Sequence, residues 1–374
     1  MISTTKKQRV VIKIGSSSLT SRQGEISRKK LEKLANQIVL LKDMGHEVIL
    51  VSSGAVAAGY RKLGCLERPK TLPEKQAAAS IGQGLLMESY ADLFFTHGYV
   101  AGQILITRSD FLDEDRYRNV RNTLNVLLER GIIPIVNEND TVTVDHLKFG
   151  DNDTLSAKVA SLVDANHLII LSDINGLYSE DPTKNSQAKL VEHVHEITPE
   201  IEASAGGSGS DVGTGGMTSK IEAVKIAMAS GITTFLGNAS IKNIVVNALS
   251  GEAKGTYFKG EKPSIRLNHK RKWIAFNSDP EGKIFIKQSA KNSLLERQQS
   301  LLPSGVYKTT GQFEKDAVIR IYDNDGDEIG LGVVNCSSEE LQQLILQNNA
   351  FQESTPFVID INQFVCHLDV PITL

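Results

Sequence analysis

The sequence predicts an α/β protein in which an open parallel sheet is followed by a small β-rich domain. Over about the first 250 residues, short β-branched runs alternate with longer amphipathic stretches, as expected for parallel strands joined by helices on both faces of a sheet. This alternation stops in a polar, irregular stretch at 251–272, after which short apolar runs are separated by turn signals. We therefore expect a first domain at 1–258, a linker at 259–277 and a second domain with a C-terminal tail at 278–374.

Each strand is predicted from an apolar run rich in β-branched residues. Between the first two strands, Ser27 is placed to cap a helix whose apolar residues recur at helical spacing until Gly45 ends it. Strand, helix and strand in that order form a βαβ unit. The predicted strands are 10–14, 47–51, 100–106, 132–136, 167–171 and 233–236 in the first domain, and 283–286, 318–322 and 328–334 in the second.

The composition is typical of a globular protein of a reducing compartment. Of the 374 residues, 40% are hydrophobic and 23% are charged, which is enough to bury at least one large core. The three cysteines are far apart and indicate neither a disulfide framework nor a metal cluster. No apolar run approaches the roughly 18 residues of a membrane span, and no signal-peptide core follows the first residues. We therefore expect a cytoplasmic protein that does not enter a membrane.

The distribution of charge argues against nucleic acid as a partner. The net charge of the chain is -3, and the part from residue 270 onward holds more Asp and Glu than Lys and Arg. A grip on a phosphate backbone depends on clustered Lys and Arg side chains. We therefore expect no nucleic-acid partner for the second domain.

Two segments offer what phosphoryl transfer needs, namely positive charge and backbone N–H groups around oxygens that become more negative. In VVIKIGSSSL, Lys13 lies near the end of the first strand, and Gly15 lets the chain turn close to a ligand. In GTGGMTSK, a glycine-rich loop leads into a helix with Lys220 on its first turn, where free N–H groups favour anions. The alternatives are a solvent-exposed lysine at a strand end and a flexible linker. Neither segment matches the Walker A or the GxGxxG pattern.

Polar side chains also gather just after the predicted strands. Carboxylates and amides are concentrated at 137–140 and 151–153, while Ser52, Ser53 and Gly54 follow the second strand. Asx-rich turns are the alternative interpretation of the first two groups. Ligands of α/β sheets bind beyond the carboxyl ends of the strands, so these residues are placed to receive a polar, amine-bearing substrate with a carboxylate.

Six motifs follow one another through the first domain: VVIKIGSSSL, VSSGAVAAG, NENDTV, FGDNDTLSA, LSDINGLYSEDP and GTGGMTSK. In this order they resemble the motifs of glutamate 5-kinases, which are members of the amino-acid-kinase family. The segments SLLPSGV and VIRIYDNDGDEIGLGVV of the second domain resemble a PUA domain. The resemblance implies an amino-acid-kinase fold followed by a PUA-like domain.

The same resemblance implies the activity. ATP would phosphorylate the side-chain carboxylate of L-glutamate to give L-glutamyl 5-phosphate, the first step of proline biosynthesis, with Mg²⁺ bridging the phosphates of ATP. It also implies a homo-oligomer, feedback inhibition by proline and functional coupling to glutamyl phosphate reductase.

Roles for single residues are carried over from the matching motif positions. Lys13 and Lys220 would be catalytic cations that flank the phosphates, with Asp153 organising them. No metal-binding residue is indicated. Glutamate would be bound by Ser53, Gly54, Asp140 and Asn152; ATP would be bound by Lys13, Ser172, Asp173, Thr214, Gly215, Gly216, Met217, Thr218, Ser219 and Lys220.

Two other interpretations stay open. The first domain alone also fits a kinase for N-acetylglutamate or aspartate, although an aspartokinase is expected to end in ACT domains. The chain could instead be an RNA-binding regulator with an inactive kinase-like domain. Retention of Lys13, Asp153 and Lys220 argues against that interpretation, and Leu368 stands where relatives often carry Arg.

Overall fold

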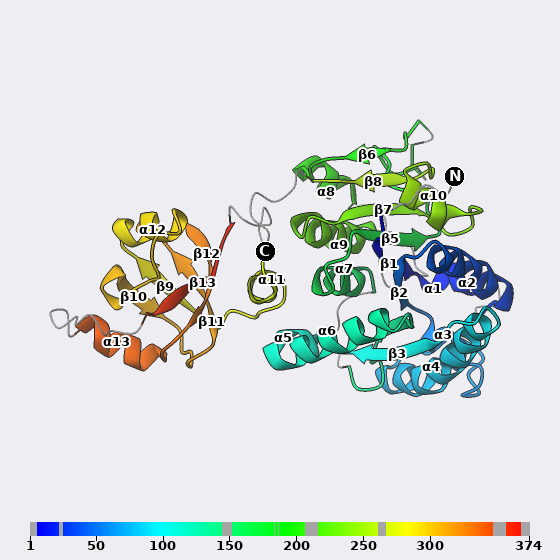
Figure 1. Ribbon diagram of the computed structural model, residues 1–374, viewed down its shortest axis with the longest axis horizontal. Helices are drawn as coiled ribbons and strands as arrows, with labels where there is room; N and C mark the ends of the chain where they lie inside the picture. Colours follow the sequence, from blue (N-terminus) through cyan, green and yellow to red (C-terminus); the bar gives the residue numbers. More distant parts are fainter. Residues whose placement is uncertain are drawn as a thin grey trace. The chain divides into compact units, whose positions relative to one another are not determined.

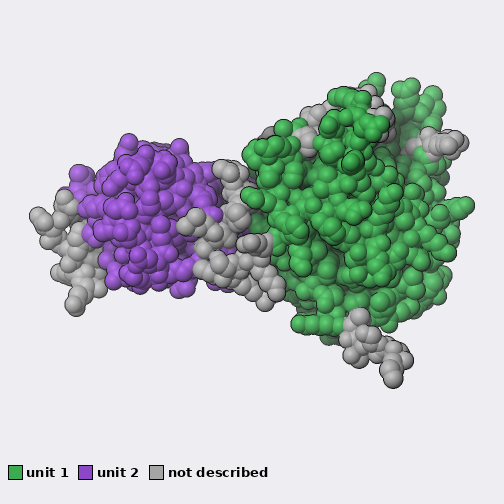
Figure 2. All heavy atoms as spheres, turned by 90° about the horizontal axis from the view of Figure 1, so that it is seen from above, with its two compact units in different colours: residues 1–110, 115–262 green, residues 111–114, 263–374 purple. Residues whose placement is uncertain are grey.

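A computed structural model of the protein describes residues 6–21, 25–143, 152–182, 184–185, 187–205, 216–260, 267–346 and 357–367. The chain divides into two compact units, one of residues 1–110 and 115–262 and one of residues 111–114 and 263–374 (Figure 2). The segment 259–277, predicted as a linker, includes helix α11 (His269–Phe276), whose last six residues are buried. The domain limits expected from the sequence stay a prediction.

The first unit is built on one sheet of eight strands within the described residues (Figure 1). Its order is β3-β4-β2-β1-β5-β7-β8-β6, and its neighbours are parallel except for the antiparallel pair β7 and β8. The strands are β1 (Arg9–Ile14), β2 (Glu47–Ser52), β3 (Ala101–Ile106), β4 (Ile133–Glu138), β5 (His167–Ser172), β6 (His193–Val194), β7 (Thr233–Asn238) and β8 (Thr256–Phe258).

The six strands predicted for this unit are confirmed, and most continue one or two residues further than expected. The clearest extension is in β4, which includes Asn137 and Glu138 of the NEND segment as paired residues. The short strands β6 and β8 were not predicted. Each has only two or three residues, which is too short for a recognisable alternation of polar and apolar side chains.

Helices cover both faces of this sheet (Figure 1). Helices α2, α4 and α10 share one apolar core with the strands, whereas α7 and α9 pack against each other on the other face. The helices of the unit are α1 (Ser16–Leu19), α2 (Arg28–Asp43), α3 (Ala55–Gly59), α4 (Leu72–Phe95), α5 (Arg108–Leu112), α6 (Glu114–Glu129), α7 (Asn152–Leu162), α8 (Pro199–Ala205), α9 (Met217–Ala229) and α10 (Ile244–Ser250). In this list α5 and α6 include the residues 111–114 that are grouped with the second unit.

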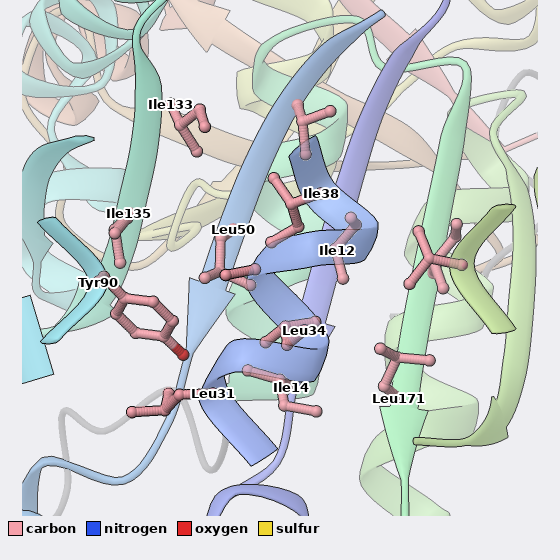
Figure 3. Packing of buried hydrophobic residues seen from close by; sticks show 14 of the residues in the cluster. Ile12, Ile14, Leu31, Leu34, Ile38, Leu50, Tyr90, Ile133, Ile135 and Leu171 are labelled. Atoms are coloured by element: carbon pink, nitrogen blue, oxygen red, sulfur yellow. The ribbon is translucent and has the colours of Figure 1, made fainter. Parts of the chain in front are cut away.

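The predicted first helix is α2, and its apolar stripe forms the centre of the core (Figure 3). It begins after Ser27 and is followed by Gly45, whose φ of 87° is the left-handed conformation that glycine favours after a helix. The side chains on its buried face pack onto alternate residues of the strands, as period-two alternation requires. The labelled contacts in Figure 3 include Leu31, Leu34 and Ile38 from α2, and Ile12, Ile14, Leu50, Ile135 and Leu171 from the sheet.

Parallel pairing brings the carboxyl ends of the central strands to one edge of the sheet. Ile14 at the end of β1 lies opposite Ser52 at the end of β2, and Val51 lies opposite Val136 in β4. The next residues of these strands therefore start the connections to α1, α3 and α7 side by side. This edge is where the polar motifs of the sequence come together.

The second unit contains a five-stranded sheet in the order β10-β9-β11-β12-β13. Its apolar core includes Ile284 and Ile286 from β9, and Ile319 and Ile321 from the neighbouring β11. The three strands predicted from the sequence are confirmed as β9, β11 and β12. The strands of this sheet and the helices between them are β9 (Gly282–Ile286), α12 (Gln288–Leu295), β10 (Val306–Thr310), β11 (Val318–Tyr322), β12 (Glu328–Val334), α13 (Ser338–Leu346) and β13 (Ile359–Cys366).

In the part of the chain that the structure describes, none of the helices has the length and apolar character that crossing a membrane would require.

Candidate active site

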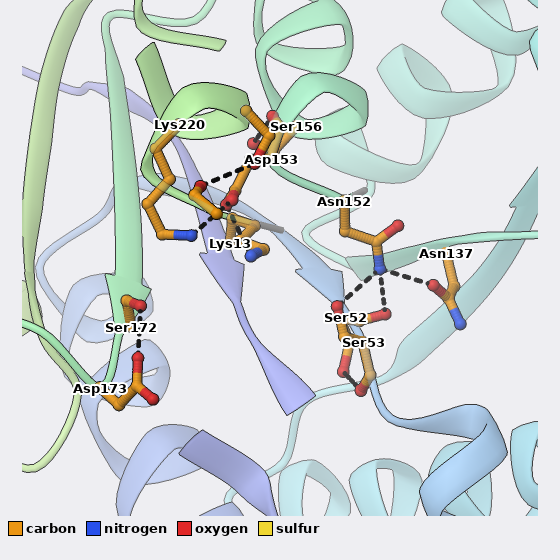
Figure 4. A network of polar contacts seen from close by, with 12 residues as sticks. Lys13, Ser52, Ser53, Asn137, Asn152, Asp153, Ser156, Ser172, Asp173 and Lys220 are labelled. Atoms are coloured by element: carbon orange, nitrogen blue, oxygen red, sulfur yellow. Dashed lines mark hydrogen bonds and ion pairs between the residues drawn. The ribbon is translucent and has the colours of Figure 1, made fainter. Parts of the chain in front are cut away.

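A buried carboxylate holds two buried lysines at the edge of the sheet (Figure 4). Lys13 Nζ lies 2.6 Å from Asp153 Oδ1, and Lys220 Nζ lies 3.0 Å from Asp153 Oδ2. Asp153 is fully buried, and both lysines are about as buried as the core, at 5% exposure each. We call Lys13, Asp153 and Lys220 the lysine cluster.

Three elements build the lysine cluster. Lys13 comes from β1 and points to the face opposite that of Ile12 and Ile14, because side chains alternate along a strand. Asp153 is on the first turn of α7 and Lys220 on the first turn of α9, and these two helices pack together on that face. The alternative interpretation, in which Lys13 points into solvent, is wrong because these helices cover it.

The lysine cluster has two basic side chains and one acidic side chain. Two lysines held by one carboxylate at the edge of the sheet offer positive charge to an anion that binds beside them. The N-terminus of α9, which begins after Gly216, adds backbone N–H groups and a positive helix-dipole end.

A second polar group lies one residue before Asp153, where Asn152 joins the ends of β2 and β4 (Figure 4). Asn152 Nδ2 lies 3.1 Å from the backbone oxygen of Ser52, 2.9 Å from Ser53 Oγ and 2.8 Å from Asn137 Oδ1. We call Ser52, Ser53, Asn137 and Asn152 the acceptor network. Since Asn152 and Asp153 are adjacent at the start of α7, that helix links the acceptor network to the lysine cluster.

The acceptor network has a defined polarity. A backbone oxygen can only accept a hydrogen bond, so the oxygen of Ser52 requires the NH₂ end of Asn152 to face it. The Oδ1 atom of Asn152 therefore lies on the side away from Ser52, as Figure 4 shows. That oxygen is a hydrogen-bond acceptor, which is the kind of atom that suits an ammonium group.

The turn after β2 presents its backbone to the same place. Gly54 has a φ of 110° and precedes α3, and a Cβ atom there would be 3.3 Å from the side chain of Ile26. Only glycine takes this conformation without strain. The Ser53 N–H donates to the backbone oxygen of Ile14, which ties the turn to the end of β1.

The end of β5 presents Ser172 and Asp173, and the Ser172 hydroxyl donates to Asp173 Oδ1 over 3.0 Å (Figure 4). Both residues line a cavity of about 310 Å³. Asn238 at the end of β7 holds this segment, because its Nδ2 donates to the backbone oxygen of Asp173 and to Asn175 Oδ1.

Residues 8–238 match the amino acid kinase family, and residues 282–348 match the PUA domain family. Glutamate 5-kinase 2 of Bacillus licheniformis is 62% identical over 374 residues, which cover 99% of this chain and all of the relative. Glutamate 5-kinase 2 of Bacillus subtilis is 60% identical over 365 residues, which cover 98% of this chain and 97% of the relative. The chain belongs to the glutamate 5-kinase family. It is an enzyme with an amino acid kinase domain and a PUA domain.

Solved structures support the fold of the first unit. A carbamate kinase from Giardia lamblia bound to AMP-PNP has a TM-score of 0.51 at 17% identity, covering 68% of this chain and 99% of that chain. At this identity the likeness shows the fold alone. The predicted α/β fold, with a PUA domain after it, is confirmed.

The structure brings together many of the residues predicted for this glutamate 5-kinase family site, but it does not test their roles. Lys13, Asp153 and Lys220 form one cluster, and Ser53 and Asn152 another. Asp140 lies two residues beyond β4 and is half-buried. Gly216, Met217, Thr218 and Ser219 precede Lys220 at the N-terminus of α9, whereas Thr214 and Gly215 lie outside the described residues.

Asn137 was expected at this edge as part of the group 137–140, but no role was assigned to it. Two further residues that the structure connects to the site were not predicted. Gln83 and Tyr90 lie inside α4 and contact the acceptor network, but no motif distinguishes them from other residues of an amphipathic stretch.

Proposed function

We propose that this protein transfers the γ-phosphoryl group of ATP to the side-chain carboxylate of L-glutamate and so forms L-glutamyl 5-phosphate. The observation that carries the proposal is the arrangement around α7. Asp153 orients two buried lysines for phosphates, while the adjacent Asn152 presents an acceptor for an amine. The names of the relatives, glutamate 5-kinases at 62% and 60% identity, support glutamate as the acceptor.

The chemistry requires no general base. The reference pKa of a glutamate side chain is about 4.3, so the attacking carboxylate is already ionised at neutral pH. The barrier is instead the repulsion between this carboxylate and the triphosphate. Lys13 and Lys220 supply the counter-charge, and Asp153 keeps both ammonium groups in place before the phosphates arrive. Asp153 is therefore an orienting residue.

We place ATP along the edge of the sheet from the lysine cluster toward β5. The N-terminus of α9, from Gly216 to Lys220, is suited to the phosphates because its N–H groups point outward from the first turn. Ser172 and Asp173 are proposed to bind the nucleoside, which is supported by their position on the cavity of about 310 Å³. Thr214 and Gly215 are included among the proposed ATP-binding residues because they belong to the GTGGMTSK motif.

Mg²⁺ is proposed to enter with ATP. Among the described residues, no group of three His, Cys, Asp or Glu side chains could hold a metal ion, and both Asp153 oxygens contact lysines. This donor set fits an ion held mainly by phosphate oxygens and water, as is usual for Mg²⁺ with nucleotides. When bound, the ion would neutralise phosphate charge and keep the γ-phosphoryl group in line with the acceptor.

Glutamate is proposed to bind at the acceptor network. Asn152 Oδ1 and the Asp140 carboxylate suit the α-ammonium group, because both are acceptors at the carboxyl end of the sheet. Ser53 and Gly54 offer a hydroxyl and backbone N–H groups at the start of α3 for a carboxylate. Each end of the amino acid then has a partner of opposite polarity.

The product is an acyl phosphate, a mixed anhydride that water can hydrolyse. We infer that it is consumed by glutamyl phosphate reductase in proline biosynthesis, in the cytoplasm, and that the kinase works as a homo-oligomer.

The acceptor can be identified directly with hydroxylamine, which traps an acyl phosphate as a hydroxamate. Glutamate is expected to give hydroxamate, whereas N-acetylglutamate should be poorer by about tenfold or more in kcat/KM, because acetylation leaves buried polar partners unpaired. Aspartate, one methylene shorter, should also be poor. Equal concentrations of the three acids are compared at fixed ATP and Mg²⁺, and preference for aspartate or N-acetylglutamate would overturn the assignment.

Feedback by proline is supported by a second cavity, of about 260 Å³, at the carboxyl end of β3. It is lined by Asn139 beside Asp140, and by Asp110 and Arg116, which pair with each other over 3.3 Å and carry the two charges that a zwitterion would bind between. Millimolar proline is therefore expected to raise the apparent KM for glutamate severalfold with little change in kcat. The Arg116→Met variant should lose most of this inhibition.

Arg118→Met is the matched control for the proline test. Arg118 is also an exposed arginine of α6 that pairs with an aspartate, Asp115, but it does not line the cavity. Initial rates are measured at sub-saturating glutamate with increasing proline. If proline leaves the rate of the unaltered enzyme unchanged, proline is not an inhibitor of this protein. If both variants lose inhibition equally, the cavity is not the proline-binding site.

A further inference from the structure

Helix α4 carries three polar side chains at intervals of seven residues. Two of them contact the acceptor network, and the third contacts the segment after β4. Gln76 Nε2 donates to the backbone oxygen of Thr143 over 3.1 Å. Gln83 Oε1 accepts from Asn137 Nδ2 over 2.9 Å, and the Tyr90 hydroxyl lies 2.9 Å from Ser52 Oγ. Seven residues are nearly two helical turns, or about 10 Å, so the three side chains lie along one side of α4.

The Gln83 contact has a polarity that the backbone fixes. The Glu138 N–H can only donate, and it donates to Asn137 Oδ1 over 2.9 Å. The Asn137 NH₂ group must therefore point the other way, where Gln83 Oε1 accepts it. Asn137 is only 3% exposed. Removing the Gln83 oxygen would therefore take a hydrogen-bond acceptor away from a buried Asn137 NH₂ group, which is costly.

The Tyr90 contact joins two hydroxyl groups. Ser52 Oγ also lies 3.1 Å from the backbone oxygen of Ser53, which can only accept a hydrogen bond. When the Ser52 proton is donated to that oxygen, Tyr90 is the donor to Ser52 Oγ. Burial raises the pKa of Tyr90, which keeps this hydroxyl protonated. Figure 3 shows the ring of Tyr90 fixed in the apolar core beside β2 and β4.

We propose that α4 positions the acceptor-binding site, with Gln83 acting through Asn137 on Asn152 and Tyr90 acting through Ser52 on the turn after β2. Gln83 and Tyr90 are positioning residues, because each acts on the site through another side chain. This inference rests on the proposed function, because it assumes that the acceptor network binds the substrate that receives the phosphoryl group.

This arrangement predicts an effect on the acceptor and not on the nucleotide. The lysine cluster comes from β1, α7 and α9, whereas α4 contacts the ends of β2 and β4. Gln83→Met removes the acceptor oxygen while keeping a straight, helix-favouring side chain. We expect it to raise the KM for glutamate about tenfold and to change the KM for ATP less than about twofold, since one buried hydrogen bond is lost.

A double-variant cycle tests whether Gln83 acts through Asn137. Asn137→Leu keeps a side chain of similar size but has no polar atom, so neither the oxygen nor the NH₂ group of Gln83 has a partner there. In that background, Gln83→Met should raise the KM for glutamate less than about twofold, because coupled residues give non-additive effects. Effects that multiply, about tenfold in both backgrounds, would overturn the proposal.

Two further variants complete the test. Tyr90→Phe keeps the buried ring and should raise the KM for the acceptor severalfold. Ser80→Ala is the control on the same helix, because among the described residues the exposed Ser80 hydroxyl bonds only the backbone oxygen of Ala77 within α4. It should leave both KM values unchanged. If folded Gln83→Met, checked by thermal melting, has the KM of the unaltered enzyme, Gln83 has no positioning role.

The acceptor panel is measured first on the unaltered enzyme, which separates this inference from the proposed function. If aspartate or N-acetylglutamate proves to be the acceptor, glutamate is wrong and the cycle is run with that acid. An acceptor-specific, non-additive change in KM would then still support positioning by α4.

Discussion

Replacing Lys13 or Lys220 by methionine is expected to lower kcat about a hundredfold or more, with the fold retained. Each lysine is an ion-pair partner of the buried Asp153, so either change removes one of the two basic side chains of the lysine cluster. Loss of one preorganised group that stabilises transition-state charge typically costs about 3 to 4 kcal/mol. Because the charge on the transferring group grows in the transition state, the loss should fall mainly on kcat.

Lys225→Met is the matched control for this experiment. Lys225 is on the same helix as Lys220 but pairs with Glu202 of α8, away from the cluster. Turnover is measured at saturating ATP and glutamate, together with the melting temperature of each variant. A folded Lys13 or Lys220 variant that keeps more than half of the turnover would remove that lysine from the proposed mechanism.

The local part of this site could be predicted from the sequence. The β-branched run around Lys13 marks β1, and the carboxylates and amides after β4 mark the edge of the sheet where ligands bind. Asn152 and Asp153 are neighbours in sequence, so their joint position at one helix start follows from the start of α7.

The burial of Lys13 could not be predicted from its surroundings in the sequence. A lysine near a strand end ordinarily reaches solvent, and what encloses this one is the packing of α7 and α9, which begin at Asn152 and Met217. Long-range contacts of this kind depend on the order of strands in the sheet. Local periodicity does not encode that order.

The role of α4 was hidden for a different reason. Gln83 and Tyr90 act through partners in β4 and β2, and their spacing of seven residues is shared by many side chains on one face of any helix. The pairing of β2 with β4 places the ends of these two strands side by side, so that one face of α4 can contact both. The motifs locate groups proposed to touch the substrate, whereas the contacts that hold those groups follow from the fold.

Gly82→Ala is expected to destabilise the protein by about 3 kcal/mol or more, because there is no room for a methyl group where α3 crosses α4. A Cβ atom at Gly82 would lie 1.8 Å from the backbone oxygen of Ala55, and one at Gly59 would lie 1.9 Å from that of Ala78. Backbone atoms of both helices would have to separate. Since α3 starts directly after Gly54, the displacement should also raise the KM for the acceptor.

Gly84→Ala tests the same change two residues further along α4, where a Cβ atom meets nothing within 4 Å. There alanine should stabilise the protein by about 0.5 to 1 kcal/mol, because it restricts the unfolded chain and favours the helix. Urea unfolding of Gly82→Ala, Gly59→Ala and Gly84→Ala gives the three free energies. Equal stability of Gly82→Ala and Gly84→Ala would show that the two helices do not meet at their glycines, and the tight crossing that sets α4 against the turn after β2 would then have to be abandoned.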